Sequence, residues 1–283
     1  YEIIPHTVQG SIDRIKGIKN IIAVASGKGG VGKSTTSVNL ALALKEEGAT
    51  AAILDADIYG PSIPRMLGLS GRPDSEDGKK LEPKVGHGLQ AMSIGLLVDE
   101  DTPMIWRGPM VTQALEQLLS DTNWEDVDFL IIDLPPGTGD VQLTLCQKIP
   151  LSGAVIVTTP QDISLIDARK GLKMFEKVEV PVLGVVENMS TFICPKCGTT
   201  ESIFGEGGGE QLAMENDVKL LGELPLQKSI REEMDKGTPT VSENPESPTS
   251  MAYREIARKM AATLSMRKKD YSSAFPKIVI QND

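Results

Sequence analysis

The feature that most constrains this chain is a glycine-rich stretch near its start, GKGGVGKST at residues 27–35, which fits the P-loop pattern G-x-x-x-x-G-K-[ST]. A compact apolar run at 21–25 precedes it, as in a buried strand, and apolar residues at helical spacing follow over 36–47. A glycine-rich turn between a strand and a helix points backbone N–H groups and a helix N-terminus at an anion. The predicted nucleotide-binding residues of this loop are Gly27, Lys28, Gly29, Gly30, Val31, Gly32, Lys33, Ser34 and Thr35.

Specific roles follow from the chemistry of the loop and of the strand ends. Lys33 is expected to reach the terminal phosphates, and the Ser34 hydroxyl to ligate Mg²⁺. The apolar run 129–132 ends at Asp133 in the Walker B form, whose carboxylate holds Mg²⁺ directly or through water. Asp57 follows another strand and Asp140 follows the loop after Asp133, so both are expected at the same sheet edge and either could orient an attacking water. Taken singly, such an Asp can equally cap the next turn.

Strand and helix patterns alternate along the chain and predict an α/β fold with a doubly wound, mostly parallel sheet flanked by helices. The expected strands are 20–26, 51–54, 89–94, 129–133, 154–158, 182–186 and 218–221. The expected helices are 34–47, 108–119, 141–148, 162–177, 207–216, 229–235 and 251–266. Loops are expected at 70–88, from 224 onwards and at 237–249. The predicted division is an N-terminal arm or linker at 1–18, a P-loop ATPase domain at 19–267 and a flexible tail at 268–283.

The composition limits which binding partners and which cellular compartment we expect. A net charge of −10 argues against broad binding to nucleic acid or to an anionic membrane, so neither is expected as a partner. Neither a membrane-length apolar run nor a secretory leader pattern occurs. Three cysteines, an odd number, indicate a reducing compartment, which means the cytoplasm, or the mitochondrial matrix in a eukaryote. The basic helix at 251–266 is expected to pack on the sheet rather than to lie on a membrane.

Cys194 and Cys197 form a C-x-x-C pair with the spacing of a metal knuckle. Four sulfurs complete a tetrahedral zinc site or a four-iron cluster, and the third cysteine, Cys146, lies in an apolar helix where a plain core thiol is expected. A complete site is therefore expected to need two chains related by a twofold axis. Spacing alone leaves open a structural zinc, an iron–sulfur cluster, a redox pair or no metal.

These motifs together resemble a known family. The P-loop resembles the deviant Walker A motif of the MinD, ParA and nitrogenase-iron-protein class of SIMIBI-type P-loop NTPases. With four further stretches it is similar to the Mrp/ApbC family of iron–sulfur carrier ATPases, including a NUBPL-like branch, over about residues 19–264. Those stretches are 55–62, 106–108, 133–140 and 188–197.

The resemblance implies further roles. Lys28 would be the signature lysine that reaches the partner's nucleotide across a homodimer, Asp57 the switch I carboxylate, and Asn188 the adenine contact with Pro225 nearby. It implies a slow, Mg²⁺-dependent ATPase whose cofactors are ATP, Mg²⁺ and a [4Fe–4S] cluster that bridges two chains through Cys194 and Cys197. Its partners would be apo iron–sulfur proteins and cluster-assembly scaffolds. The alternative is a MinD/ParA-like positioning ATPase with a structural zinc knuckle.

Overall fold

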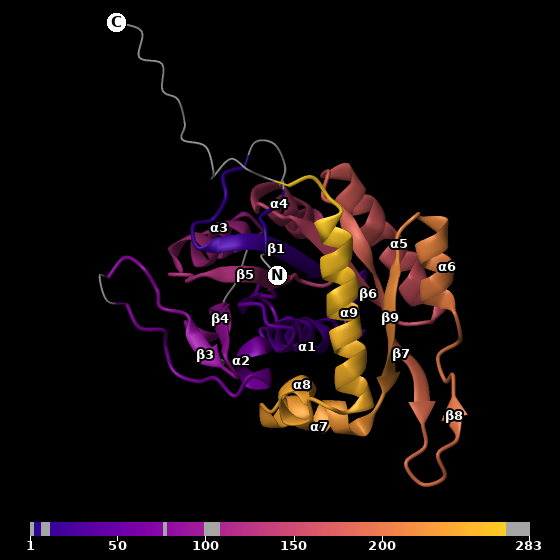
Figure 1. Cartoon of the computed structure of the whole chain (residues 1–283). Coiled ribbons are helices and arrows are strands. Elements are labelled where there is room, and N and C mark those ends of the chain that lie inside the picture. Colours follow the sequence, from indigo (N-terminus) through magenta and orange to yellow (C-terminus); the bar gives the residue numbers. More distant parts are fainter. Residues whose placement is uncertain (1–2, 7–11, 76–77, 99–107, 270–283) are drawn as a thin grey trace, which may run out of the picture.

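The computed structural model describes residues 3–6, 12–75, 78–98 and 108–269, and a single nine-stranded sheet runs through it (Figure 1). The strand order is β3-β4-β2-β5-β1-β6-β7-β8, with β9 also paired to β7. All pairs are parallel except β3 with β4 and β7 with β8, as expected for a doubly wound fold. The strands are β1 (Ile18–Ala25), β2 (Ala51–Asp55), β3 (Lys84–Gly86), β4 (Leu89–Ser93), β5 (Val127–Asp133), β6 (Gly153–Thr158), β7 (Val182–Ile193), β8 (Thr200–Glu201) and β9 (Leu220–Leu226).

Helices cover both faces of the sheet and make two cores. One core lies under α3, α4, α5 and α6, and the other under α1, α2, α7, α8 and α9 (Figure 1). The helices are α1 (Lys33–Glu46), α2 (Ile63–Met66), α3 (Gly108–Asp121), α4 (Asp140–Lys148), α5 (Asp162–Lys177), α6 (Gly208–Glu215), α7 (Lys228–Lys236), α8 (Thr240–Glu243) and α9 (Pro248–Ser265), with a short 3₁₀ turn η1 (Ile94–Leu96). In β1, Ile21 and Ala23 enter the first core and Ile22 and Val24 the second, so a strand buried on both faces reads as one apolar run.

Four segments differ from the sequence-based expectation. β7 continues to Ile193, well past the expected end at 186, and β9 runs through Pro225, where a loop was expected to begin. Short elements β3 and α8 also lie inside the expected loops 70–88 and 237–249. Pro225 is compatible with a strand because β9 pairs only with β7, so its missing N–H can face the open side of an edge strand.

The last helix, α9, packs against α1 and β9. Its side chains Tyr253, Ile256 and Met260 are fully buried in the second core. This agrees with the expectation that its apolar face packs on the sheet. None of the helices in the described ranges is long and apolar enough to cross a membrane.

The strand register brings three strand ends together. Val24 of β1 and Asp55 of β2 both pair with Asp133 of β5, so the P-loop and two carboxylates leave the sheet side by side. This edge is the one on which parallel α/β sheets bind ligands.

Candidate nucleotide and metal-binding site

The P-loop connects β1 to α1, and two of its glycines are conformationally required. Gly30 and Gly32 have φ angles of 83° and 81°, a region that residues with a Cβ rarely adopt. Gly32 is also closely packed, because a Cβ there would lie 2.2 Å from Nδ2 of Asn188. The loop is therefore built for an unobstructed backbone that curls around a ligand.

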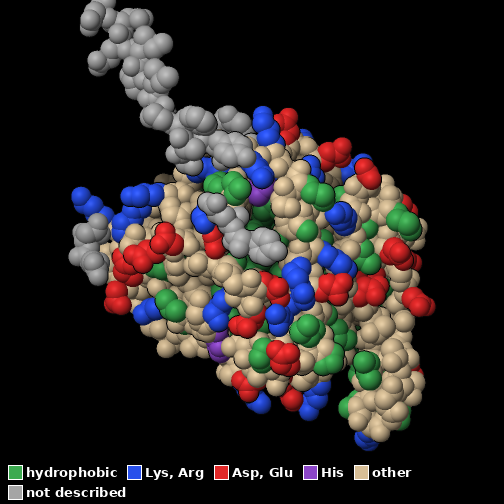
Figure 2. Space-filling model, viewed as in Figure 1, with side chains coloured by type: hydrophobic (Ala, Val, Ile, Leu, Met, Phe, Trp, Pro, Cys, Tyr) green, Lys and Arg blue, Asp and Glu red, His purple; other side chains and the backbone are tan. Residues whose placement is uncertain are grey.

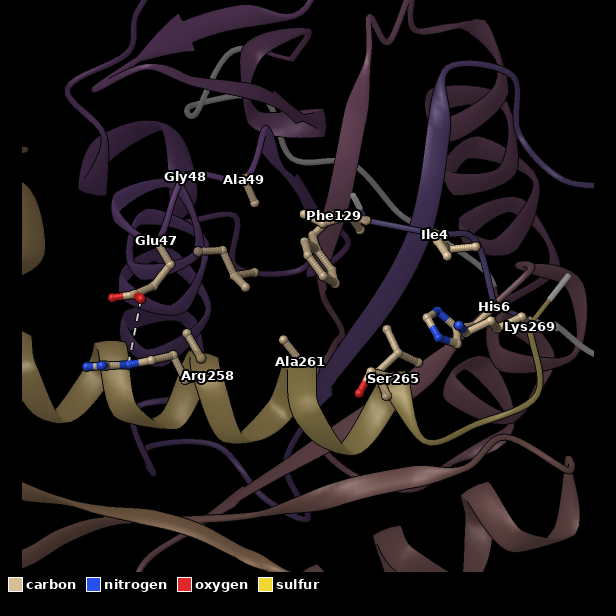
Figure 3. A pocket seen from close by; sticks show the side chains of 14 residues that line it. Ile4, His6, Glu47, Gly48, Ala49, Phe129, Arg258, Ala261, Ser265 and Lys269 are labelled. Atoms are coloured by element: carbon tan, nitrogen blue, oxygen red, sulfur yellow. Dashed lines mark ion pairs between the residues drawn. The ribbon is translucent and has the colours of Figure 1, made fainter. Parts of the chain in front are cut away.

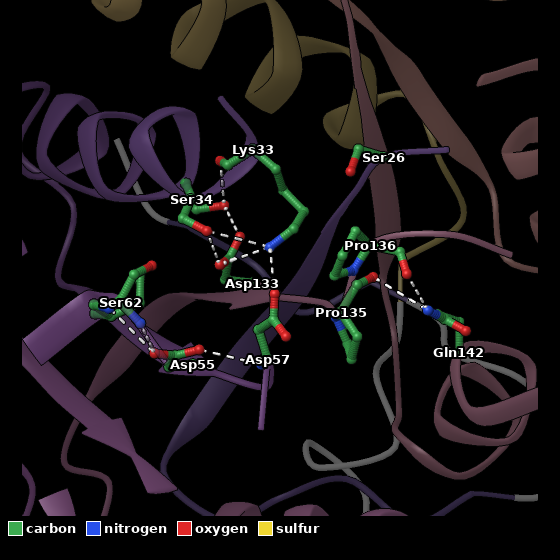
Figure 4. Close-up of polar contacts among 12 residues, drawn as sticks. Ser26, Lys33, Ser34, Asp55, Asp57, Ser62, Asp133, Pro135, Pro136 and Gln142 are labelled. Carbon is green, nitrogen blue, oxygen red and sulfur yellow. Dashed lines mark hydrogen bonds and ion pairs between the residues drawn. The ribbon is translucent and has the colours of Figure 1, made fainter. Parts of the chain in front are cut away.

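Lys33 is the cation at the centre of the site (Figure 4). Its side chain is buried, and Nζ lies 2.8 Å from Oδ2 of Asp133 and 3.9 Å from Oδ2 of Asp57. A buried ammonium needs such partners because desolvation of an unpaired charge is costly. We call Asp55, Asp57 and Asp133 the carboxylate cluster. Its three acids outnumber the single lysine that contacts two of them.

Asp133 is fully buried and accepts two hydroxyl hydrogen bonds from α1. Oγ of Ser34 donates to Oδ2 at 2.6 Å, and Oγ of Ser37 donates to Oδ1 at 2.7 Å. Hydroxyl and carboxylate oxygens are the donors that Mg²⁺ prefers, and the cluster has acidic charge beyond what Lys33 neutralises. The residues present therefore fit a magnesium ion held between Ser34 and Asp133.

Asp55 organises the loop that carries Asp57. Its Oδ1 accepts the Asp57 N–H at 3.1 Å, and its Oδ2 accepts the N–H groups of Ser62 and Ile63 and the Ser93 hydroxyl at 3.0–3.1 Å. Burial, and then the charge of Asp133, raise the pKa of Asp55 from 3.8 to about 7. Burial and Asp133 also raise the pKa of Asp57, against the opposing charge of Lys33.

The loop after Asp133 is held by two hydrogen bonds near its middle. Nε2 of Gln142 donates to the Pro136 carbonyl at 2.6 Å (Figure 4). The Gly137 N–H donates to the Ser26 carbonyl at 2.9 Å, so the loop lies against the start of the P-loop. Asp140 opens α4 and is exposed, and its side chain makes no hydrogen bond or ion pair with the P-loop in the described structure.

Other expected nucleotide contacts surround the loop. Lys28 is half-buried and forms no ion pair with a described residue. Asn188 is buried and its Nδ2 donates to the Val31 carbonyl at 2.9 Å. Pro225 follows Leu224, which pairs with Asn188 across β7 and β9. Trp106 and Arg107 lie outside the described residues.

The C-x-x-C pair sits on a hairpin that projects from the end of β7 (Figure 1). The Cys194 N–H donates to the Thr199 carbonyl and the Gly198 N–H to the Cys194 carbonyl, each at 2.9 Å, which closes the turn. Cys197 is exposed, and hydrogen bonds first from Thr199 and then from Cys194 lower the pKa of its thiol. A lowered thiol pKa favours the thiolate, which is the form that binds metals.

The third thiol has a different environment. Cys146 is buried in α4, and burial raises the pKa of its thiol to about 12, as expected of a core residue. Among the residues that the structure describes, no third His, Cys, Asp or Glu side chain joins Cys194 and Cys197 to make a metal-binding group of three.

Three contributors to the site were given no role in the sequence-based prediction. Ser37 is one helical turn after Lys33, and that spacing is the signal that could have placed it beside Asp133. Asp55 directly follows the expected strand 51–54 and was given no role, and its bonds to Ser62 and Ile63 depend on how the following turn folds back. Gln142 contributes through a hydrogen bond from α4 to Pro136, in the loop that precedes this helix.

Searches against known proteins agree with this geometry. Residues 17–261 match the family model described as ParA, NUBPL iron-transfer P-loop NTPase. Over 251 residues the chain is 62% identical to the "iron-sulfur cluster carrier protein" of Escherichia coli K12, covering 88% of this chain and 68% of that one.

Solved structures are similar as well. The nucleotide-binding protein of Archaeoglobus fulgidus, in complex with ADP, is 38% identical with a TM-score of 0.73, over 84% of this chain and 93% of that one. The cell division ATPase MinD of Pyrococcus furiosus has a TM-score of 0.64 at 23% identity, over 86% of this chain and 98% of that one, and shows a shared fold.

Proposed function

This chain belongs to the ParA-type family of NUBPL iron-transfer P-loop NTPases, and from that premise we propose that it is an ATP-hydrolysing iron–sulfur cluster carrier. One observation carries the proposal: the same chain holds a P-loop and a surface cysteine pair, with Cys197 exposed and Cys194 half-buried, and the strand β7 contacts the first through Asn188 and leads into the second. Recipients would be apo iron–sulfur proteins supplied from cluster-assembly scaffolds.

At the nucleotide site, the residues divide into binding and catalytic roles. ATP phosphates would lie in the cradle of residues 27–35, with Lys33 exchanging its bond to Asp133 for phosphate oxygens. Mg²⁺ would be held by Ser34 and Asp133 and would neutralise phosphate charge. Asp57, which is half-buried, would orient the attacking water, whereas Asp140 would need the loop to move.

At the cysteine site, we propose that two chains share one [4Fe–4S] cluster. Cys194 and Cys197 supply two of the four thiolates that such a cluster takes, and a twofold axis through the hairpin would supply the other two. Ile193, which precedes Cys194, and Ile203, which follows β8 in the same hairpin, are 45% and 52% exposed, which suits burial against a second copy. Lys28 would then face the partner's nucleotide across the homodimer.

β7 offers a physical path between the two sites. Nδ2 of Asn188 donates to the Val31 carbonyl of the P-loop, and Cys194 lies six residues further on, past an irregularity in β7 where Met189 has a φ of 58°. A nucleotide that displaces Asn188 would therefore move the strand that carries the cysteine hairpin. In this way, ATP or ADP in the P-loop would change the affinity of the two chains for the shared cluster.

The test is anaerobic reconstitution with iron and sulfide, followed by absorbance near ~400 nm and by counting iron, sulfide and zinc per chain. We expect about two irons and two sulfides per chain, with the dimer detected by light scattering. Cys197→Ala should lose the cluster and Cys146→Ala should keep it, because Cys146 is a core thiol on a different element. A Cys197→Ala protein with a full cluster would contradict the proposed ligands.

The same experiment distinguishes the cluster carrier from the alternative, a positioning ATPase with a structural zinc. About half a zinc per chain with no sulfide would make the hairpin a structural clasp and favour a positioning ATPase. The MinD similarity does not favour that role, since at 23% identity it concerns the fold alone.

A further inference from the structure

A cavity of about 680 Å³ lies at the sheet edge opposite the P-loop (Figure 3). Its walls come from the end of α1, the first half of β5, the second half of α9 and the arm at residues 3–6. The 14 residues of α1 separate it from the P-loop by about 20 Å. We call it the basal cavity; it belongs to neither of the sites described above.

The middle of the basal cavity is apolar, and the charged side chains at one end form ion pairs with one another. Leu44, Phe129 and Ala261 line the middle. At one end Arg258 Nε lies 3.7 Å from Oε2 of Glu47, whose Oε1 is 2.7 Å from Arg254 Nε, so these charges are already paired. Figure 3 shows this pair at one end of the cavity and His6 with Ser265 and Lys269 at the other. Such a shape suits an apolar body with a single polar head.

The polar head would contact His6, and the contact with Asn20 determines which tautomer the His6 ring adopts. Nδ2 of the buried Asn20 donates to the Ile4 carbonyl at 3.1 Å, which leaves Oδ1 as an acceptor. That oxygen accepts the backbone N–H of His6 at 3.0 Å and lies 3.1 Å from its Nδ1. The neutral ring therefore carries its hydrogen on Nδ1, and Nε2 presents a lone pair.

Nε2 of His6 has no hydrogen-bond partner among the described residues, although the side chain is only 5% exposed. The ring points into the basal cavity (Figure 3). Buried acceptors are nearly always paired with protein or another molecule, so an unpaired one that faces a cavity indicates what the cavity holds. A lone pair requires a donor, and exposed Lys269 at this end disfavours a cationic one.

We propose that the basal cavity binds a small amphipathic alcohol, with its aliphatic chain over Phe129 and Ala261 and its hydroxyl donating to Nε2 of His6. Arg258 and Ser265, which mark the two ends, are seven residues apart on α9, about 10 Å. An extended eight-carbon alcohol has a similar length. This site is independent of the cluster-carrier proposal.

The test is a titration of the full chain with 1-octanol, read by ¹H–¹⁵N NMR of the histidine rings. The chain has two histidines, and His87 is an internal reference because its ring nitrogens already lie 2.8 Å from Ser242 Oγ and from the Gly237 carbonyl. We expect a saturable shift of the His6 Nε2 signal and none for His87, whose signals a His87→Gln variant identifies. Heptyl methyl ether, which has the same length but no donor, should leave the His6 signal unmoved.

Two variants locate the site. Ala261→Phe fills the middle without touching His6 and should weaken octanol binding at least tenfold by calorimetry; His6→Phe removes the acceptor and should do the same. Thermal unfolding and ATP binding show that both variants are folded. The proposal is overturned if octanol gives no saturable His6 shift up to its solubility, if the ether shifts it equally, or if folded Ala261→Phe binds octanol as well as the parent does.

Discussion

The carboxyl group of Asp55 should make the nucleotide-free protein less stable as the pH rises through neutrality. Its pKa is raised from 3.8 to about 7 in the folded chain, first by burial and then by Asp133. The folded state thus holds this proton more tightly than the unfolded state does. The stabilisation is fully present below about pH 4 and is lost as the pH rises through the folded pKa.

The size of the effect follows from the same values. A difference of about three in pKa, at 1.36 kcal/mol each, amounts to about 4 kcal/mol in the free energy of unfolding. Roughly 2–3 kcal/mol of this should fall between about pH 5 and pH 8, where the protein can be studied without acid unfolding. Asp55 is fully buried, so solvent screening does not reduce the figure as it would at the surface.

The assay is urea unfolding of the parent and of Asp55→Asn, without nucleotide or Mg²⁺, at several pH values in that range. The variant cannot titrate at this position, so the parent should lose about 2–3 kcal/mol relative to it as the pH rises. Asp74→Asn, at an exposed position, is the matched control and should run parallel to the parent. Parallel curves for the parent and Asp55→Asn would refute the argument that Asp55 is protonated near neutrality.

Three substitutions test other contacts. Gly32→Ala should weaken ATP binding at least tenfold by calorimetry, because its Cβ would displace Asn188; Gly71→Ala, with a similar φ of 73° and nothing within 4 Å, controls for backbone strain and should bind normally. Ser37→Ala removes a hydrogen bond to the Asp133 carboxylate and should cost about 1.5–3 kcal/mol in urea unfolding; an unchanged midpoint would contradict the bond. Leu115→Ala should cost about 2–5 kcal/mol of stability while leaving ATP affinity intact, since Leu115 is fully buried in the core under α3; altered affinity would mean that this core shapes the site.

The sequence predicts the parts of the fold that depend on local pattern. β1, β5 and β6 are buried on both faces over most of their length, so each contains a continuous apolar run, at 21–25, 129–132 and 154–157. β7 past 186 is different, because Glu187 and Asn188 are buried polar residues whose partners, Gly209 and Val31, are distant in sequence. A prediction based on apolar residues therefore ends this strand at 186, although β7 continues through polar residues that are hydrogen-bonded to distant parts of the chain.

The candidate site likewise has parts that the sequence predicts and parts that it does not. The P-loop and Asp133 follow from motif and strand position, and the structure brings Lys33, Ser34 and Asp133 into direct contact. Motifs cannot show that Asp55 holds the Asp57 loop, since this depends on where a turn folds back. The nucleotide roles of Lys28, Asn188 and Pro225 remain predictions.

The position of α9 also has a consequence for biosynthesis. α1 begins at Lys33 of the P-loop, yet it packs against α9, whose residues Tyr253, Ile256 and Met260 are translated last among the helices described here. At about 5–20 residues per second, a ribosome needs on the order of tens of seconds to pass from one helix to the other. During that interval the side chains of α1 that α9 covers would be exposed, so we expect this half of the second core to form only after α9 has been synthesised.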